Sequence, residues 1–316
     1  KTDPPTNPSG VLPSTFTVVP ADAAGIQALM PWETQDPGRG VYPAGGKIVG
    51  STSTALSPSI FAGVPFTVKT RVVDRYFNLV ASTANVYLAT TDKFDVSPNT
   101  STFNSDGTKD LTVTLKTRAA NHTIFASNPA NNFGDYGPPN AANQTTQFFT
   151  ESSAPVRLMV LLPGETEVEG KPADVDEDGN AKSGEPAGKK GRPGIFTIGA
   201  ATDVVVNMVD AYYNRVTASA LQPTVALATP RDDVDATETL PAKLMSMGSI
   251  PFSYGTGDPI EPRRARFDYV VGATCTVSPA AISSATSSDW EVDPGAVHHL
   301  EFDDLAASTG TMGPVL

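Results

Sequence analysis

The 316-residue chain is poor in cysteine and histidine, with one residue of the first type and three of the second. A single cysteine excludes an internal disulfide, and so few thiol and imidazole groups leave little material for a metal cage built on them. Long hydrophobic runs are also lacking. Since a membrane-spanning helix needs about 18 consecutive apolar residues, the sequence predicts no membrane span.

Positive charge is scarce relative to negative charge. The chain has 22 basic and 34 acidic residues, a formal net charge of −12. Nucleic acid is therefore not expected as a partner, because a phosphate backbone attracts a basic face. No serine, histidine and aspartate occur in a sequence context that indicates a catalytic triad, and no G-x-S-x-G motif is present. We accordingly expect no enzymatic activity. Hydrophobic residues make up 39% of the chain, which is enough for packed cores.

Internal repeats determine the organisation of the chain. Three motifs occur twice in the same order, with the spacing between copies rising from 132 to 136 to 139 residues. Small loop insertions in the second copy would produce this drift. The pairs are Pro31-Trp-Glu-Thr34 with Pro163-Gly-Glu-Thr166, Val73-Asp-Arg-Tyr-Phe-Asn78 with Val209-Asp-Ala-Tyr-Tyr-Asn214, and Val86-Tyr-Leu-Ala-Thr90 with Val225-Ala-Leu-Ala-Thr229.

The repeats predict two full modules with partial modules at both ends. A third module start at 295–302 resembles residues 154–160. We therefore expect an extended segment and closing strand at 1–24, a first module at 25–153, and a second module at 154–294 with an acidic loop insertion at 165–192. Residues 295–316 begin a third module. This arrangement predicts an array that continues beyond the chain.

Each module is predicted to be all-β. In residues 64–74, Phe66, Val68, Thr70 and Val72 alternate with polar residues, which is typical of a half-buried strand. Short strands separated by Gly, Pro, Asn and Asp clusters indicate two tandem immunoglobulin-like β-sandwiches. Aligning 124–126 with 275–277 places the lone Cys275 in a core.

The motifs resemble a known family. A Leu-Leu-Pro-Gly-Glu-Thr strand end at 161–166, a Gly/Pro-rich loop, an alternating strand and then Val-Asp-x-Tyr-x-Asn are similar to bacterial immunoglobulin-like repeats. These are the invasin and filamin-type modules of large secreted or surface proteins. The chain departs from their pattern at Phe77 and Tyr213, where many such repeats have Gly. The resemblance implies a structural role outside the cell or at its surface, in stalks, adhesins, filaments or coats.

The sharpest chemical motif lies in the acidic loop of the second module. Residues 174–185 match the calcium-loop pattern D-x-[DN]-x-[DN]-G-x₅-E. Calcium prefers six to eight oxygen ligands, and carboxylates at loop positions 1, 3, 5 and 12 with a carbonyl at position 7 would supply them. Lys182 at position 9 weakens the match, and the alternative is a solvated acidic loop. The predicted Ca²⁺ ligands are Asp174, Asp176, Asp178, Asn180 and Glu185.

Two further groups of residues admit a functional and a structural interpretation. Asp74, Asn78, Asp210 and Asn214 recur at equal spacing, and we expect them to form turns because Asp and Asn bond their own backbone. Phe133 and Tyr136 lie in the Asn-, Pro- and Gly-rich segment 128–147. Aromatic rings among small polar residues stack on sugars, so these two are candidate ligand-binding residues. Local packing is the alternative.

The leading functional hypothesis is a structural repeat protein of an extracellular bacterial assembly, such as a filament, stalk or surface layer. Its expected partners are other copies of itself or neighbouring modules, joined head to tail when an edge strand accepts a segment such as residues 1–20. The first alternative is a calcium-stiffened adhesin that binds a glycan or a surface protein. The second is a non-catalytic module of a larger secreted enzyme.

Overall fold

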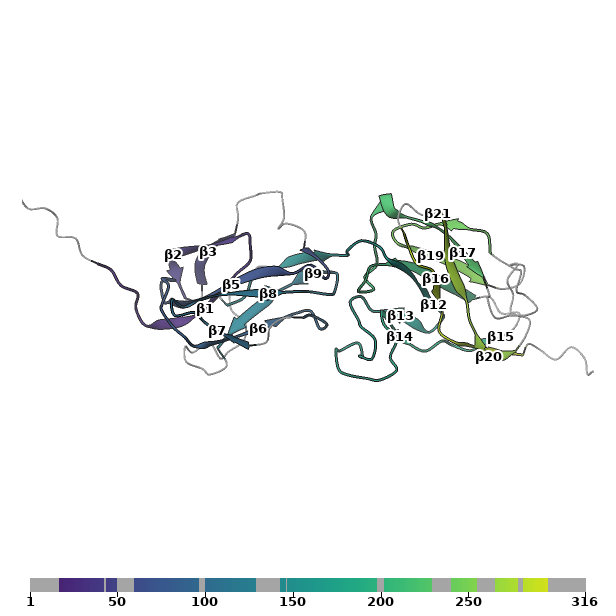
Figure 1. Ribbon diagram of the computed structural model, residues 1–316, viewed down its shortest axis with the longest axis horizontal. Coiled ribbons are helices and arrows are strands. Elements are labelled where there is room, and N and C mark those ends of the chain that lie inside the picture. The colour runs from purple at the N-terminus through teal and green to yellow at the C-terminus, as the bar shows by residue number, and fades with distance from the viewer. Residues whose placement is uncertain are drawn as a thin grey trace, which may run out of the picture. The chain divides into compact units, whose positions relative to one another are not determined.

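The computed structural model describes residues 17–42, 44–49, 60–96, 100–128, 143–145, 147–197, 202–228, 240–254, 265–277 and 281–294. The chain divides into two compact units, Lys1–Glu151 and Ser152–Leu316. Figure 1 colours the strands of the first from purple to teal, and those of the second from teal to yellow. The described elements are strands and one short 3₁₀ helix, Ser219–Leu221, which confirms the all-β class. No helix within these ranges is long and apolar enough to cross a bilayer.

The first unit contains three small antiparallel or mixed sheets around one core. Their strand orders are β1-β5-β8, β10-β6-β7 and β4-β11-β9, and a separate hairpin pairs β2 with β3. The strands are β1 (Ala23–Leu29), β2 (Glu33–Val41), β3 (Ala44–Val49), β4 (Ile60–Phe61), β5 (Phe66–Asp74), β6 (Asn85–Thr90), β7 (Thr100–Thr102), β8 (Thr108–Val113), β9 (Ala119–His122), β10 (Ile124–Ser127) and β11 (Phe148–Glu151).

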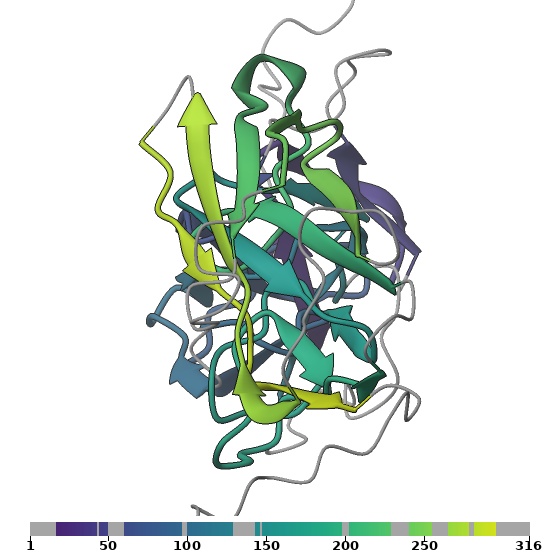
Figure 2. The same cartoon turned by 90° about the vertical axis from the view of Figure 1, so that its right-hand side faces the viewer.

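The second unit, coloured from teal to yellow in Figure 2, repeats this scheme. Its orders are β12-β16-β19, β15-β23-β20 and β18-β17-β21-β22, with a β13-β14 hairpin. The strands are β12 (Arg157–Leu161), β13 (Glu165–Glu167), β14 (Lys189–Gly191), β15 (Phe196–Thr197), β16 (Thr202–Val209), β17 (Thr224–Ala228), β18 (Lys243–Leu244), β19 (Ser249–Tyr254), β20 (Arg266–Tyr269), β21 (Gly272–Val277), β22 (Ala285–Thr286) and β23 (Trp290–Asp293).

The strand order in both units is that of an immunoglobulin-like sandwich. An immunoglobulin sandwich pairs its first, second and fifth strands in one sheet and its third, sixth and seventh in the other. In the first unit the sheet β1-β5-β8 is the first group, and β6, β9–β10 and β11 supply the second. A short strand also runs parallel to the last strand of each unit, β4 beside β11 and β15 beside β23. The fold class therefore follows from the chain's own pairing.

The cores lie between the facing sheets, as the alternating patterns predict. Along β5 the side chains of Val68, Thr70 and Val72 are buried, while Thr67 and Lys69 between them are exposed. Each unit has its own large apolar cluster. Burying one aliphatic side chain stabilises the folded state by about 1.5–3 kcal/mol, so these clusters supply the main driving force for each unit.

Strand pairing corrects one detail of the repeat alignment. Leu88 lies opposite Ala126 and Leu227 lies opposite Ala273, so Ala126 corresponds to Ala273 and not to Val277. Cys275 is consequently half-buried beside the core, and burial raises the pKa of its thiol. The predicted alignment was wrong because a period-two pattern looks the same after a shift of four residues.

A buried Glu–Lys pair joins the two strands of the hairpin in each unit. These glutamates belong to the repeated Pro-x-Glu-Thr motif. In the first unit the Nζ of Lys47 lies 3.4 Å from an oxygen of Glu33, and in the second the Nζ of Lys189 lies 2.8 Å from Glu165. Each glutamate also accepts a hydrogen bond from the backbone N–H three residues earlier, at 2.8 Å and 2.9 Å. The motif therefore ends one strand and starts the hairpin.

Each lysine connects its hairpin to distant parts of the unit. Lys47 donates to the carbonyl of Gln144 at 2.7 Å. Lys189 donates to the carbonyl of Val160 at 3.2 Å and to the hydroxyl of Ser288 at 2.9 Å. Burial lowers the pKa of Lys47, and the Glu33 carboxylate opposes this effect. Because these acceptors satisfy the ammonium group from several sides, the pair is stable in a nearly dry environment.

We predict that Lys189→Met lowers the free energy of unfolding of the second unit by about 3 kcal/mol, because it leaves the buried Glu165 carboxylate without its cation. The neighbouring Lys190→Met is the matched control. Its side chain is 44% exposed and lies 3.7 Å from Glu177, so its loss should cost less than about 1 kcal/mol. Denaturant unfolding followed by Trp290 fluorescence, in a Trp32→Phe background, measures both. Equal effects of the two substitutions would contradict the assigned role of the buried pair.

Candidate functional site

The acidic loop of the second unit is held by its own hydrogen bonds. The backbone N–H of Asp174 donates to the carbonyl of Glu185 at 3.0 Å, and the N–H of Lys182 donates to the carbonyl of Asp174 at 2.8 Å. One carboxylate oxygen of Asp174 accepts the N–H of Gly184 at 2.8 Å. Residues 174–185 thus form a closed loop whose two ends are joined.

Asp176 organises the tip of this loop. Its Oδ1 accepts the backbone N–H groups of Asp178 and Asn180, both at 2.9 Å. Hydrogen bonding from Asn180, first through its backbone and then through its side chain, lowers the pKa of the exposed Asp176 carboxyl. This carboxylate therefore stabilises the loop by accepting hydrogen bonds from its backbone.

Glu185, the predicted twelfth ligand, is paired with lysines. Its Oε1 lies 2.6 Å from the Nζ of Lys182, and its Oε2 lies 3.8 Å from the Nζ of Lys171. The hydrogen bond from Lys182 is the main reason that the pKa of Glu185 is lowered. Lys171 is fully buried at the base of the loop and donates to the carbonyl of Pro186 at 2.5 Å. Glu185 would have to leave Lys182 before it ligated a cation.

The predicted calcium ligands do not converge in this conformation. Throughout the described ranges no three acidic, histidine or cysteine residues form a group able to hold a metal ion. The carboxylates of Asp174 and Asp176 accept hydrogen bonds from loop N–H groups, and that of Glu185 is paired with lysine ammonium groups. Calcium binding at Asp174, Asp176, Asp178, Asn180 and Glu185 stays a prediction that requires a rearranged loop. The other predicted ligand-binding residues, Phe133 and Tyr136, lie outside the described residues.

The two Asp-x-Tyr-x-Asn segments form matching turns around a buried carboxylate. Asp74 accepts the N–H groups of Tyr76 and Asn78 at 2.8 and 3.0 Å and the Nδ2 of Asn78 at 2.9 Å. Asp210 makes the corresponding bonds to Tyr212 and Asn214 at 2.8, 2.9 and 3.0 Å. These residues therefore have the turn role expected of them.

Each turn places an aromatic residue in a left-handed conformation. Phe77 and Tyr213 have φ values of 64° and 66°. Both rings pack against a hairpin glycine, since a Cβ added to Gly46 would lie 2.1 Å from the ring of Phe77 and one added to Gly188 would lie 2.5 Å from Tyr213. The absence of a glycine side chain thus allows the aromatic residue to occupy this position.

The same aspartates also hold the segment by which the chain enters each unit. The backbone N–H of Ala21 donates to Oδ2 of Asp74 at 3.0 Å, and that of Ser153 donates to Oδ2 of Asp210 at 2.9 Å. Burial alone would raise the pKa of Asp74, but its hydrogen bonds from Asn78, Ala21 and Tyr76 outweigh burial and lower it. The residues just before β1 and just before β12 are therefore anchored in the same way.

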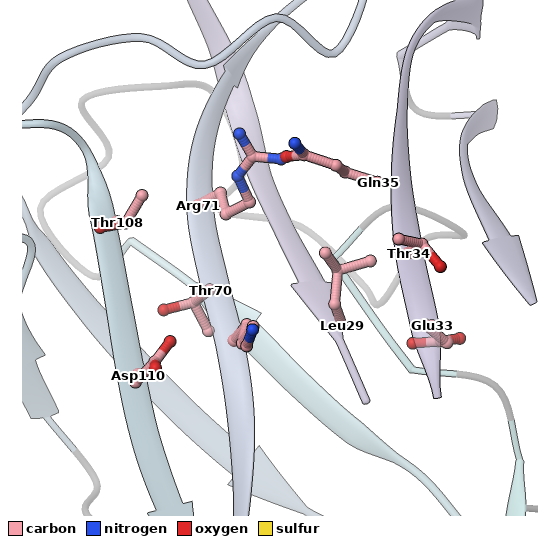
Figure 3. A pocket seen from close by; sticks show the side chains of 9 residues that line it. Leu29, Glu33, Thr34, Gln35, Thr70, Arg71, Thr108 and Asp110 are labelled. Atoms are coloured by element: carbon pink, nitrogen blue, oxygen red, sulfur yellow. The ribbon is translucent and has the colours of Figure 1, made fainter. Parts of the chain in front are cut away.

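A pocket in the first unit was not foreseen from the sequence. Figure 3 shows it between β2 and the sheet of β1, β5 and β8, with Arg71 and Thr34 among its labelled lining residues. Lys69 also lines the pocket. The signal was present in the repeat alignment. At an offset of 136 residues, Lys69 and Arg71 correspond to Val205 and Asn207, so the two copies differ in charge on this face.

Comparisons with known proteins give weak likenesses. No protein-family model and no curated protein matches the chain. Among solved structures it is similar to the Escherichia coli adhesin FdeC, with 13% identity, a TM-score of 0.30, and coverage of 78% of this chain and 68% of that one. Domains 5–6 of the S-layer protein SbsC have 13% identity and a TM-score of 0.22, with coverage of 77% of this chain and 96% of that one. Bacteroides uniformis β-glucuronidase 3 has 12% identity and a TM-score of 0.24, with coverage of 77% of this chain and 25% of that one. TM-scores of this size do not establish a shared arrangement.

We predict that Asp74→Asn destabilises the first unit by about 1–3 kcal/mol at neutral pH, because an amide cannot accept all the hydrogen bonds of the buried carboxylate. Since the folded-state pKa is lowered, this stabilisation is complete above the unfolded value of about 3.9 and is lost as pH falls through the folded value. The difference between wild type and variant should therefore shrink in acid. Calorimetric unfolding between neutral pH and pH 2.5 measures it, with the exposed Asp22→Asn as control. A gap that does not vary with pH would contradict the assignment.

For the acidic loop, we predict that calcium raises the thermal midpoint of the wild type but not that of an Asp174→Ala, Asp176→Ala double variant. Because the Lys182 ammonium competes for Glu185, Lys182→Ser should increase calcium affinity. Titration calorimetry with CaCl₂ on the full chain measures the affinities. An unchanged wild-type midpoint at saturating calcium would reject the site.

Proposed function

We propose that this chain is a structural repeat region of an extracellular bacterial assembly, a filament, stalk or surface layer. Its modules act as rigid beads. Each sandwich closes around its own core, and repetition of such units builds a long structure from short ones. The described residues contribute no catalytic step to this function.

The observation that carries the proposal is the matched anchoring of the two entry segments. Ser153 follows the boundary between the units, and its N–H is bound by Asp210. Ala21 is bound by Asp74 with the same geometry. The chain that leads into β1 is thus bound in the same way as the chain that leads into β12 from the boundary between the units. This likeness supports a tandem arrangement in which each module fixes the direction of the preceding chain.

Head-to-tail joining is the proposed mode of assembly. In it, residues 1–20 or an equivalent segment add to a sheet edge of a neighbouring copy, so that backbone hydrogen bonds supply the contact. The parallel strands β4 and β15 illustrate how a two-residue segment adds beside a last strand. Most of the proposed donor, residues 1–16, lies outside the described residues, as does the segment 295–316.

A ligand-binding adhesin is the second candidate function. The polar pocket of the first unit favours it, because a purely mechanical module gains nothing from a solvent-accessible pocket with charged walls. In that case the modules would present the site at a distance from the cell, and the acidic loop would stiffen the array when it bound calcium.

We predict that electron microscopy of the purified chain shows regular filaments or a lattice, and that a chain lacking residues 1–20 does not assemble. Normal assembly of the truncated chain would reject the donor segment while leaving the structural role intact. Dispersed two-bead particles would favour the adhesin. Imaging with and without a calcium chelator adds a second comparison, since loss of order in chelator would assign the acidic loop a role in assembly.

A further inference from the structure

The pocket of the first unit lies outside the hydrophobic core. It has a volume of about 420 Å³ and is bounded by β2 on one side and by the outer face of β1, β5 and β8 on the other (Figure 3). Lys69 and Arg71 reach this face because they alternate along β5 with side chains that point into the core. Small-molecule sites commonly measure about 300–1,000 Å³, so the pocket is large enough for a ligand of monosaccharide size.

Strand pairing gathers polar groups on this face. In the β5–β8 ladder, Thr108 lies beside Arg71 and Asp110 lies beside Lys69. Thr34 of β2 lines the pocket from the other side. The hydroxyl of Thr108 donates to Asp106 at 2.7 Å and can still accept a hydrogen bond, as can the carboxylate of Asp110. The hydroxyl of Thr34 can donate or accept, so these walls match a ligand that carries several hydroxyl groups.

The second unit shows that the fold does not require a polar face here. Val205 and Asn207 stand at the positions of Lys69 and Arg71, and Pro251 lies opposite Val205. Under the β13-β14 hairpin, this face carries a small apolar cluster. It consists of Met159, Leu161 and Val209 with the partly buried Val205 and Tyr213. The first unit has charged groups on a surface that its duplicate buries.

Arg71 is the most unusual group in the pocket. Its side chain is half-buried, and its Nη1 is enclosed without a hydrogen-bond partner in the described part of the chain. Burial lowers the pKa of this guanidinium, although Asp106 opposes the shift. The exposed side chain of Gln35 points toward the guanidinium (Figure 3). Rotation of Gln35 would expose Nη1, and a carboxylate could then accept two parallel hydrogen bonds from Arg71.

The other charges of the pocket limit the class of ligand. Glu33 is neutralised by Lys47, and Asp110 lies opposite Lys69 in the strand ladder. Asp106 compensates part of the charge of Arg71. The charges around the pocket are therefore nearly balanced, which favours a ligand with a single carboxylate over a multiply charged anion that would meet Asp110. Leu29 adds an apolar contact for the C–H face of a sugar ring.

From this geometry we propose that the pocket binds a carboxylate-bearing sugar, a hexuronate alone or as part of an acidic glycan, with Arg71 holding the carboxylate. The threonine hydroxyls and Asp110 bind the sugar hydroxyls. Such a site needs only the first unit, and it does not depend on the assembly proposed above.

The test is titration of the full chain with sodium glucuronate, followed by NMR of leucine methyl groups. A single hexuronate should bind saturably with a dissociation constant on the order of 1 mM. The methyl signals of Leu29 should shift, whereas those of Leu161, its counterpart in the second unit, should not. No saturable shift of Leu29, or equal shifts at both residues, would overturn the proposal.

Variants and competing ligands test the individual contacts. Arg71→Gln should weaken binding at least tenfold, while Arg75→Gln, which removes the same charge from an exposed position beside Tyr76, should leave it unchanged. Gln35→Ala provides a second test that spares the sheet and should strengthen binding. Glucose, acetate and phosphate should all bind more weakly than glucuronate. Undiminished binding by Arg71→Gln, or tighter binding of any of the three competitors, would reject the carboxylate-bearing sugar.

Discussion

The buried Glu–Lys pair is the interaction on which the outer layer of each unit depends. Glu33 with Lys47 and Glu165 with Lys189 join the two strands of a hairpin. The remaining hydrogen bonds of these residues link the hairpin to the rest of the unit. The two units differ under and beyond that hairpin. In the first unit it forms one wall of a polar pocket, and in the second it covers an apolar cluster and carries the acidic loop. A buried ion pair has directional contacts, so it fixes the position of the hairpin while the residues beneath it differ between units.

The repeated features differ in what they tolerate. The two buried aspartates bind the same set of N–H groups in both units, because a buried carboxylate leaves little freedom for its neighbours. The outer face of the sheet is less constrained, since either apolar packing or solvated charges satisfy it. The turn and the ion pair are thus common scaffolding, and functional differences between modules are expected on the outer face.

The sequence was sufficient to predict the all-β class and the strand at 64–74. Alternation in 64–74 identified the buried side of β5, because one face of a strand in a sandwich must be apolar. The Pro-x-Glu-Thr repeat also located equivalent strand ends correctly. The alignment at Cys275 failed because alternation does not distinguish shifts by an even number of residues. The acidic motif specified ligand types and spacing, but it could not show that Lys171 and Lys182 form ion pairs with Glu185. The pocket depends on pairing between distant strands and was beyond prediction from one copy alone.

The contact between a hairpin glycine and a left-handed aromatic residue links two positions that are far apart in sequence. Gly46 has no space for a Cβ while Phe77 is present, and Gly188 has none while Tyr213 is present. A module with glycine in the turn would free that space and relieve the left-handed strain at once. Among related repeats an aromatic turn residue should therefore always be accompanied by a hairpin glycine. A glycine in the turn would remove the steric part of this requirement and leave only the φ values of +71° at Gly46 and +72° at Gly188 to favour glycine in the hairpin. Such a pattern would identify members of this repeat type even where overall similarity is too low to detect.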